Sequence, residues 1–326
     1  MVQKNLMSGM RPTGKLHLGN YLGALSNWVK LQEEYNCFYS IVDWHALTTG
    51  YEDTSEIKVN IKEMLIDWLS AGIDPEKSVV FVQSQVKETA ELHLLFSMIT
   101  PLSWLERNPT YKEQLKQLEG RNITNYGFLG YPVLQAADIL ICRGEVVPVG
   151  EDQLPHLELT REIARRFNYL YEPIFPEPKA LLTEAKVLPG IDGRKMSKSY
   201  QNTIEMSDSP DEIRRKTKLM VTDPERIRKT DPGHPDICSV FAYNKLFIKE
   251  HIEDIRKECE KGKIGCVECK RRLAESIINE MRPIYEKRKE LENKPSILED
   301  ILIDGSKRAQ KVASETIKMV REAMKI

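Results

Sequence analysis

The chain has 326 residues, with 48 Lys and Arg against 49 Asp and Glu, which gives a formal net charge of −1. This length can bury a large core and is typical of two domains, while the balanced charge gives no sign of a nucleic-acid partner. No apolar run approaches the ~18 residues of a membrane span, and the N-terminus lacks the apolar segment of a signal peptide, so we expect a cytoplasmic protein without membrane contact.

The first predicted strand covers residues 6–10 and is followed by a glycine turn over 11–15 and an amphipathic helix. A strand, a glycine turn and a helix N-terminus form an anion site, because free N–H groups and the helix dipole favour phosphate. Gly19 leaves room for a nucleotide ring or ribose against the backbone. His17 and Asn20 are one helical turn apart and share a face. Taken alone, His17 is more often an exposed histidine at a helix start.

Strand and helix then alternate. Strands are predicted over 37–42 and 78–83, with a helix over 56–71 between them that ends at Gly72. This alternation predicts an α/β fold with a doubly wound parallel sheet. His45 follows the carboxyl end of a strand, where open α/β sheets bind ligands, so it is either a nucleotide contact or a packed loop histidine.

Helices and one more strand surround the next motif. Residues 88–120 are predicted to be largely helical, with interruptions at Pro101 and Pro109. Residues 145–149 predict a further strand that ends in the polar segment 150–153. These segments complete the predicted α/β part of the chain.

The motif itself is a helix predicted over 131–139, with Pro132 in its first turn. Tyr131, Gln135 and Asp138 recur at spacings of four and three, so their polar groups share one face. Their neighbours are apolar, and a carboxylate in such surroundings is costly unless a donor reaches it. Asp138 is therefore either a ligand-binding carboxylate or one half of a salt bridge.

The segment Lys-Met-Ser-Lys-Ser over 195–199 lies in a loop that contains Gly190 and Gly193. Lys195 and Lys198 are mobile point charges that can follow negative charge onto a leaving group. The glycines allow the loop to open and to close on ATP. Alone, such a match is about equally often a Lys/Ser-rich surface turn.

Beyond Ser199 the periodicity is helical without a clear strand, which predicts a separate α-helical domain. Four cysteines lie in it, and their spacing, which ends in Cys-x-x-Cys, is typical of a metal site; four unrelated buried cysteines are the alternative. A zinc ion and a [4Fe–4S] cluster both accept four Cys ligands. A single Cys-x-x-Cys pair favours the cluster over Zn²⁺. The proposed ligands are Cys238, Cys259, Cys266 and Cys269.

Two of these segments resemble the signature elements of the class I aminoacyl-tRNA synthetases. Residues 12–20, Pro-Thr-Gly-Lys-Leu-His-Leu-Gly-Asn, resemble the HIGH-type element, and residues 195–199 resemble the KMSKS element. Both occur in the right order, at opposite ends of one predicted α/β domain. Asn20 in place of the final histidine resembles the tryptophan enzymes of the class. The resemblance covers nearly the whole chain and is weakest around the cysteines.

The resemblance implies a domain division and a reaction. A Rossmann-type catalytic domain over 1–200 would carry a connective insertion around 88–130, and an α-helical domain over 201–326 would face the anticodon side of the tRNA. Some bacterial tryptophan enzymes carry a similar C-terminal cysteine set with an iron–sulfur cluster. The implied reaction is the activation of L-tryptophan with ATP and Mg²⁺ to the adenylate, followed by transfer to tRNA(Trp), in a homodimer.

The resemblance also assigns roles to residues of this sequence. The implied catalytic residues are His17, Asn20, Lys195 and Lys198. The implied ATP-binding residues are Arg11, Pro12, Thr13, Gly19, Asn20, His45, Gly150, Glu151, Asp152, Val187, Lys195, Met196, Ser197, Lys198 and Ser199. The implied tryptophan-binding residues are Met7, Gly9, Tyr131, Gln135, Asp138, Val147, Val149 and Gln153.

The sequence departs from the family pattern at two places. Related enzymes usually have a second lysine near Gln114, so it stays open whether Gln114, Lys112 or Lys116 touches the triphosphate. Tryptophan enzymes more often have Met where Gln135 stands; here the amide is expected to bond the substrate amino group.

Three alternatives remain beside a tryptophan enzyme. A tyrosine enzyme of the same class uses a similar Tyr/Gln/Asp face, but it usually has Tyr where Met7 stands, and Met suits an indole face. In a tryptophan enzyme, Asp138 would accept the indole N–H. A non-catalytic tRNA-binding paralogue is disfavoured by the two lysines Lys195 and Lys198, and a nucleotidyltransferase by the helical C-terminal part.

Overall fold

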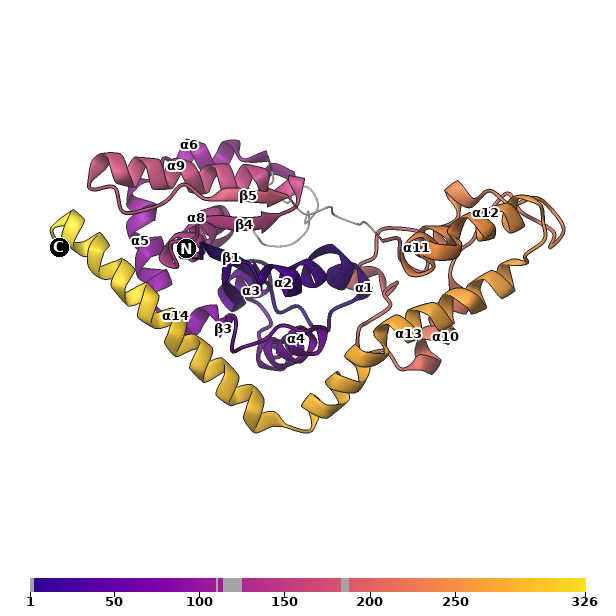
Figure 1. The fold of residues 1–326 in the computed structure, drawn as a ribbon. Helices are drawn as coiled ribbons and strands as arrows, with labels where there is room; N and C mark the ends of the chain where they lie inside the picture. The colour runs from indigo at the N-terminus through magenta and orange to yellow at the C-terminus, as the bar shows by residue number, and fades with distance from the viewer. Residues whose placement is uncertain (1–2, 110, 114–124, 183–187) are drawn as a thin grey trace.

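A parallel sheet forms the centre of the molecule in this computed structural model, which describes residues 3–109, 111–113, 125–182 and 188–326 (Figure 1). The described strands pair in the order β3-β2-β1-β4-β5, all parallel. The predicted α/β fold is therefore confirmed. The strands are β1 Asn5–Met10, β2 Asn36–Ile41, β3 Val79–Val82, β4 Val146–Val149 and β5 Lys179–Leu182.

This strand order reverses direction between β1 and β4, so the carboxyl ends of these two strands flank a crevice. Ligands bind at such switch points in open α/β sheets. Strand β1 is buried from Leu6 to Ser8, and all of β4 is buried, as expected of central parallel strands. Strand β5 was not predicted, because Lys179–Leu182 is partly exposed and lacks β-branched residues.

Helices cover both faces of the sheet and continue into a helical region at one end (Figure 1). Those of the sheet-containing part are α1 Leu18–Asn20, α2 Ser26–Leu31, α3 Asp43–Gly50, α4 Ile57–Ala71, α5 Glu88–Ile99, α6 Leu102–Arg107, α8 Tyr126–Ile141 and α9 Leu154–Leu170. Those after the second signature segment are α10 Pro210–Leu219, α11 Ser239–Phe247, α12 Ile252–Glu260, α13 Cys266–Glu292 and α14 Pro295–Met324. A π-helical turn, η1 Tyr21–Leu25, joins α1 to α2. The 3₁₀ turns are η2 Gln83–Gln85, η3 Glu151–Gln153, η4 Lys198–Tyr200, η5 Pro235–Ile237 and η6 Lys249–His251.

Two local predictions were wrong. Helix α8 begins at Tyr126, where the Asn125 side chain accepts a hydrogen bond from the N–H of Phe128, so Pro132 lies inside the helix and not in its first turn. His45 lies in helix α3 and not in a loop. The predicted end of α4 at Gly72 is confirmed, because this glycine has a φ of 110°, a value that favours glycine.

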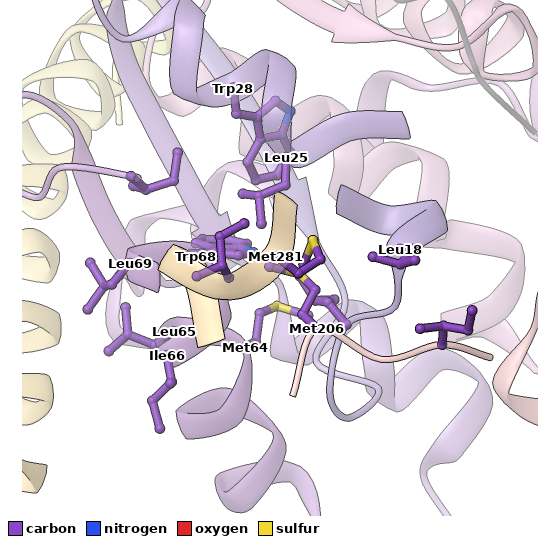
Figure 2. Close-up of a cluster of buried hydrophobic side chains, with 14 of the residues drawn as sticks. Leu18, Leu25, Trp28, Met64, Leu65, Ile66, Trp68, Leu69, Met206 and Met281 are labelled. Carbon is purple, nitrogen blue, oxygen red and sulfur yellow. The ribbon is translucent and has the colours of Figure 1, made fainter. Parts of the chain in front are cut away.

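The two large clusters of buried apolar side chains among the described residues lie one on each face of the sheet. On one face, α2 and α4 pack together and α13 joins them; Figure 2 shows Met281 of α13 beside Trp68, Met64 and Met206. On the other face, α5, α8 and α9 pack with α14. The helical segment beyond residue 200 therefore contributes to both cores. The predicted domain boundary at residue 200 stays a prediction.

Helix α14 runs back along the sheet-containing part, against β3 and α5 (Figure 1). It approaches the strand so closely that a Cβ on Gly305 would lie 1.8 Å from the carbonyl oxygen of Val80. Only glycine allows this contact. Among the described residues, no helix combines the length and the apolar character that a membrane crossing requires.

Candidate active site

A cavity of about 610 Å³ opens at the carboxyl ends of β1 and β4. All eight residues predicted to bind tryptophan line it, namely Met7, Gly9, Tyr131, Gln135, Asp138, Val147, Val149 and Gln153. Five of the predicted ATP-binding residues line it as well, namely Arg11, Asn20, His45, Gly150 and Asp152. The structure thus brings these two sets together, and their individual roles stay predictions.

Asp138 is buried at the cavity wall, with only 5% of its surface exposed. Its carboxylate accepts a hydrogen bond from Gln83 Nε2 at 2.7 Å and pairs with His45 Nε2 at 2.9 Å. The Gln83 oxygen in turn accepts the backbone N–H of Trp44 at 3.0 Å, which fixes the orientation of the amide. Two protein donors therefore compensate the buried carboxylate, and His45, expected beside the nucleotide, contacts Asp138.

A second polar chain crosses the cavity wall through His156. Tyr131 Oη lies 2.8 Å from His156 Nε2, and His156 Nδ1 lies 3.1 Å from the side-chain oxygen of Gln153. Burial lowers the pKa of His156 to about 4, so the ring is neutral at pH 7. Because the Gln153 oxygen can only accept, Nδ1 carries the proton and Nε2 accepts from the Tyr131 hydroxyl. This leaves the lone pairs of Tyr131 Oη available to a donor.

The first signature segment is held in place by backbone pairing. The N–H of Leu18 donates to Ile204 O and the N–H of Met206 donates to Leu16 O, both at 2.9 Å. Within the segment, His17 Nδ1 accepts from the N–H of Asn20 at 3.3 Å, and the Asn20 side-chain oxygen accepts from the N–H of His17 at 3.1 Å. This reciprocal capping box starts the helix.

The same geometry fixes the proton of His17. Burial and the charge of Lys198 lower the pKa of His17 to about 4, so its ring is neutral at pH 7. Because Nδ1 accepts, the proton is on Nε2, and this N–H can donate to a phosphate oxygen. A Cβ on Gly19 would lie 3.0 Å from the His17 ring, so the space at Gly19 accommodates this ring.

The second signature segment contacts the first. Lys198 Nζ donates to the backbone oxygen of Thr13 at 3.0 Å, while Lys195 is exposed and its backbone bridges to Pro189. Burial lowers the pKa of Lys198, against the charges of Asp67 and Glu205, which raise it. Pro12 and Met196 are buried, whereas Thr13 and Glu151 are exposed and Ser197 is partly exposed.

Asn202 organises the loop before this segment. Its side-chain oxygen accepts the N–H of Ser197 at 2.8 Å, and its amide nitrogen donates to the backbone oxygen of Lys195 at 3.1 Å and to Asp192 at 2.7 Å. A Cβ on Gly190 would lie 2.2 Å from that amide nitrogen. The glycine at this position therefore makes room for Asn202.

The four predicted metal ligands lie in the helical region, on or beside α11, α12 and α13, and all are partly exposed. Burial, together with the charges of the three other thiols and against the Asn244 hydrogen bond, raises the pKa of Cys269 to about 11. Asn244 Nδ2 donates to the Cys269 sulfur at 3.3 Å, and Arg226 Nη1 lies 3.9 Å from the Cys259 sulfur. Within the described residues, no three or more His, Cys, Asp or Glu side chains are close enough to hold a single metal ion.

Comparison with known proteins identifies the family. A family model described as tRNA synthetases class I (W and Y) matches residues 3–282. Tryptophan–tRNA ligases from Thermotoga maritima and Aquifex aeolicus are 52% and 48% identical, over 98% of this chain and 99% of each relative. The chain belongs to the tryptophan–tRNA ligases.

Solved structures agree with this family. A tryptophanyl-tRNA synthetase from Campylobacter jejuni, complexed with ADP and tryptophan, matches with a TM-score of 0.89 and 38% identity, over 99% of this chain and 100% of that one. A tyrosyl-tRNA synthetase from Archaeoglobus fulgidus is 19% identical at a TM-score of 0.67, which shows the fold alone. This tryptophan–tRNA ligase therefore has the α/β fold that its sequence predicted.

Sequence reasoning missed three residues of this tryptophan–tRNA ligase site, namely Gln83, His156 and Asn202. Gln83 follows β3 as His45 follows β2, so the rule that indicated His45 could also have found Gln83. His156 and Asn202 carry no local signal, because their partners are distant or in irregular loops. Val187, Gln114, Lys116 and the Ser199 side chain lie outside the part of the chain that is described, and Lys112 lies in a short helical stretch.

Proposed function

We propose that this chain activates L-tryptophan with ATP to tryptophanyl-adenylate and then passes the tryptophanyl group to tRNA(Trp). The observation that carries the proposal is a continuous set of contacts. Asn20 lines the cavity, it forms the capping box with His17, and Lys198 reaches the same turn at Thr13. A cavity for the amino acid therefore adjoins a group of donors suited to a triphosphate.

In the first step, a carboxylate oxygen of tryptophan attacks the α-phosphorus of ATP, and the bond to the pyrophosphate oxygen breaks. The carboxylate is ionised at pH 7, so the step needs no general base, and catalysis consists of positioning and charge stabilisation. His17 would donate through Nε2, and Lys195 and Lys198 would balance the charge on the leaving pyrophosphate. Mg²⁺ would enter with ATP, held mainly by phosphate oxygens.

Selection of tryptophan would rest on Asp138. Each carboxylate oxygen has two acceptor positions, so Asp138 can accept the indole N–H in addition to its bonds with Gln83 and His45. The free lone pairs of Tyr131 Oη suit the substrate ammonium. Phenylalanine offers no N–H and would leave the buried carboxylate short of a donor, so we expect rejection by roughly 10⁴-fold or more.

Pyrophosphate exchange with each of the twenty amino acids tests this assignment. Tryptophan should support the fastest exchange, and tRNA(Trp) should accept the activated residue. Faster exchange with tyrosine would show that Asp138 does not select indole. No exchange with any amino acid would favour the non-catalytic tRNA-binding paralogue.

We propose that the four cysteines hold a [4Fe–4S] cluster, with Zn²⁺ as the alternative. The spacing of four cysteines in one helical region supports this, as do Asn244 and Arg226, because N–H donors around the sulfurs are typical of such clusters. Its role would be structural, since the reaction transfers no electrons. Anaerobically purified protein should be brown and contain iron, whereas one zinc per chain in a colourless protein would contradict the cluster.

We also propose a homodimer. Four large apolar side chains on α5, α6 and α8 are more than half exposed, namely Leu94, Met98, Leu102 and Tyr126. Such exposure is typical of an interaction surface. Sedimentation equilibrium should give twice the 37.6 kDa mass of one chain, and Met98→Glu should shift it toward the monomer. A monomeric wild-type protein at micromolar concentration would exclude the dimer.

A further inference from the structure

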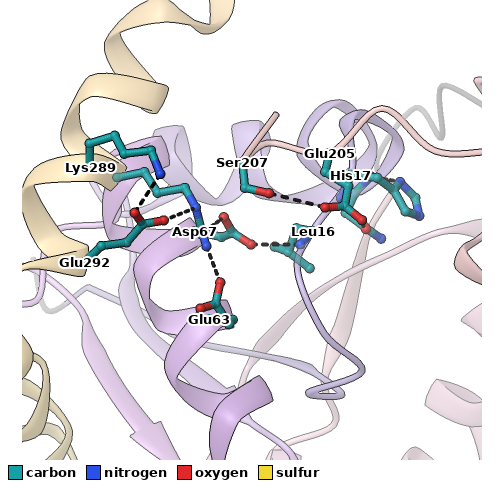
Figure 3. Close-up of polar contacts among 10 residues, drawn as sticks. Leu16, His17, Glu63, Asp67, Glu205, Ser207, Lys289 and Glu292 are labelled. Carbon is teal, nitrogen blue, oxygen red and sulfur yellow. Dashed lines mark hydrogen bonds and ion pairs between the residues drawn. The ribbon is translucent and has the colours of Figure 1, made fainter. Parts of the chain in front are cut away.

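A buried ion cluster connects α13 to the first signature segment. Arg288 of α13 has no exposed side-chain surface, and its guanidinium contacts Asp67 and Glu63 of α4. Its Nε also lies 3.2 Å from Glu292. Figure 3 shows this arrangement, with Asp67 between the two helices and the signature segment. Helix α13 is thus joined to α4 by charge as well as by the apolar contacts around Met281.

Asp67 extends this connection to the ATP-binding turn. One carboxylate oxygen contacts Arg288, and the other accepts the backbone N–H of Leu16 at 2.7 Å. Leu16 directly precedes His17. The charge of Asp67 also raises the pKa of Lys198, so Asp67 lies within electrostatic reach of both signature segments.

Such a cluster is not needed to hold the two helices together. Buried ion pairs replaced by apolar residues of similar size often leave stability unchanged or increase it, because desolvation offsets the attraction. Leu65, Trp68 and Met281 already provide an apolar interface here. What apolar residues could not supply is a fixed acceptor for the N–H of Leu16.

We propose that Asp67 and Arg288 are positioning residues for ATP. Asp67 holds the Leu16 N–H in place and so orients the His17 ring. Because Arg288 binds Asp67 from α13, the position of α13 influences how Asp67 holds Leu16. The tRNA-side helical region would thereby influence the geometry of the ATP site. This inference rests on the proposed function, because it assigns a role in adenylate formation.

The test compares Asp67→Asn with Glu63→Gln. Asp67 has two acceptor oxygens for two donors, whereas Asn has one acceptor and would present an N–H group to either Leu16 or Arg288. Glu63→Gln removes a charge from the same cluster and helix, but Glu63 does not contact Leu16, so it is the matched control. Pyrophosphate exchange should be expressed per active site, measured by an adenylate burst, to remove effects of folding.

We expect Asp67→Asn to lower kcat/KM for ATP by roughly 10²-fold, because small misplacements of reacting groups cost about this much, while KM for tryptophan changes little. Glu63→Gln should change neither quantity much. Hydrogen exchange of the Leu16 amide, followed by mass spectrometry, should accelerate in Asp67→Asn only. Equal effects of both variants on kcat/KM for ATP, or an unchanged Leu16 amide, would overturn the proposal.

Arg288→Lys tests the part played by α13. If Arg288 acts through Asp67, the effect of Arg288→Lys on kcat/KM for ATP should be largely lost when Asp67→Asn is already present. Additive effects of the two substitutions would contradict the connection. The exchange of the Leu16 amide can be measured whatever the enzyme activates. A wild-type protein without pyrophosphate exchange would therefore refute the proposed function, while the amide data would still decide whether Arg288 and Asp67 hold the turn.

Discussion

At the scale of single residues, the site depends on histidines that stay neutral. His17 and His156 both have pKa values lowered to about 4, mainly by burial; His156 accepts at one ring nitrogen and donates from the other, and His17 accepts at Nδ1. Helical spacing in the sequence was sufficient to place Tyr131, Gln135 and Asp138 on one cavity. It could not give their partners Gln83 and His156, because these come from other elements, and local periodicity carries no information about contacts across the fold.

We expect Lys198 to contribute to the rate of activation. Lys198→Ala removes a charge that would balance the leaving pyrophosphate, so we expect the adenylation rate to fall by about 10²-fold or more, with a smaller change in tryptophan affinity. Single-turnover kinetics would measure the adenylation rate separately from the affinity for tryptophan. If ATP binding weakens while the rate is retained, Lys198 serves only in ground-state binding.

His156 predicts a dependence of stability on pH. Its pKa is about 4 in the folded protein against an ordinary value of 6.5, so between these values the unfolded chain binds more protons. The free energy of unfolding should therefore fall as the pH is lowered from about 6.5 toward 4. Denaturant titrations across this range should show a weaker dependence for His156→Gln. An identical dependence in both proteins would mean that His156 does not remain neutral.

At the scale of elements, strongly periodic segments were predicted well and their limits less so. β1, β2, β3 and β4 were found from apolar runs, but β5 was missed, since an edge strand needs little apolar surface. The start of α8 was placed too late, because Pro132 resembles a first-turn residue although the chain is already helical at Tyr126. His45 was expected as a nucleotide contact or a packed loop histidine, and its helix was not foreseen because the polar residues after β2 hide the start of α3.

The close contact of α14 with β3 predicts the effect of one methyl group. Gly305→Ala would place a Cβ against the backbone of Val80, which cannot rotate away, so α14 must shift. We expect a loss of about 1–3 kcal/mol in stability, as for other overpacked cores. Ser306→Ala is the control, because this buried hydroxyl has no hydrogen-bond partner among the described residues. A Gly305→Ala protein with the wild-type melting temperature would contradict the contact.

At the scale of the whole molecule, the sequence indicated helices beyond Ser199 but not where they pack. An amphipathic helix shows which of its faces is apolar, and it does not show which surface that face will meet. α13 joins the core on one side of the sheet and α14 joins the core on the other. The charge cluster around Arg288 also could not be foreseen, because Arg288 lies more than two hundred residues from Asp67 and Glu63.

The position of α14 has a consequence for synthesis on the ribosome. β3 is a sheet edge, and α14 packs against it where Gly305 approaches Val80; nearby, Ser314 of α14 bonds Glu88 of α5, a residue 226 positions earlier in the chain. The strand therefore leaves the ribosome long before the helix that covers it. A nascent chain that has formed the sheet would expose an unpaired strand edge, which is a template for pairing with other chains. Shielding by a chaperone would be needed most in the interval before α14 emerges.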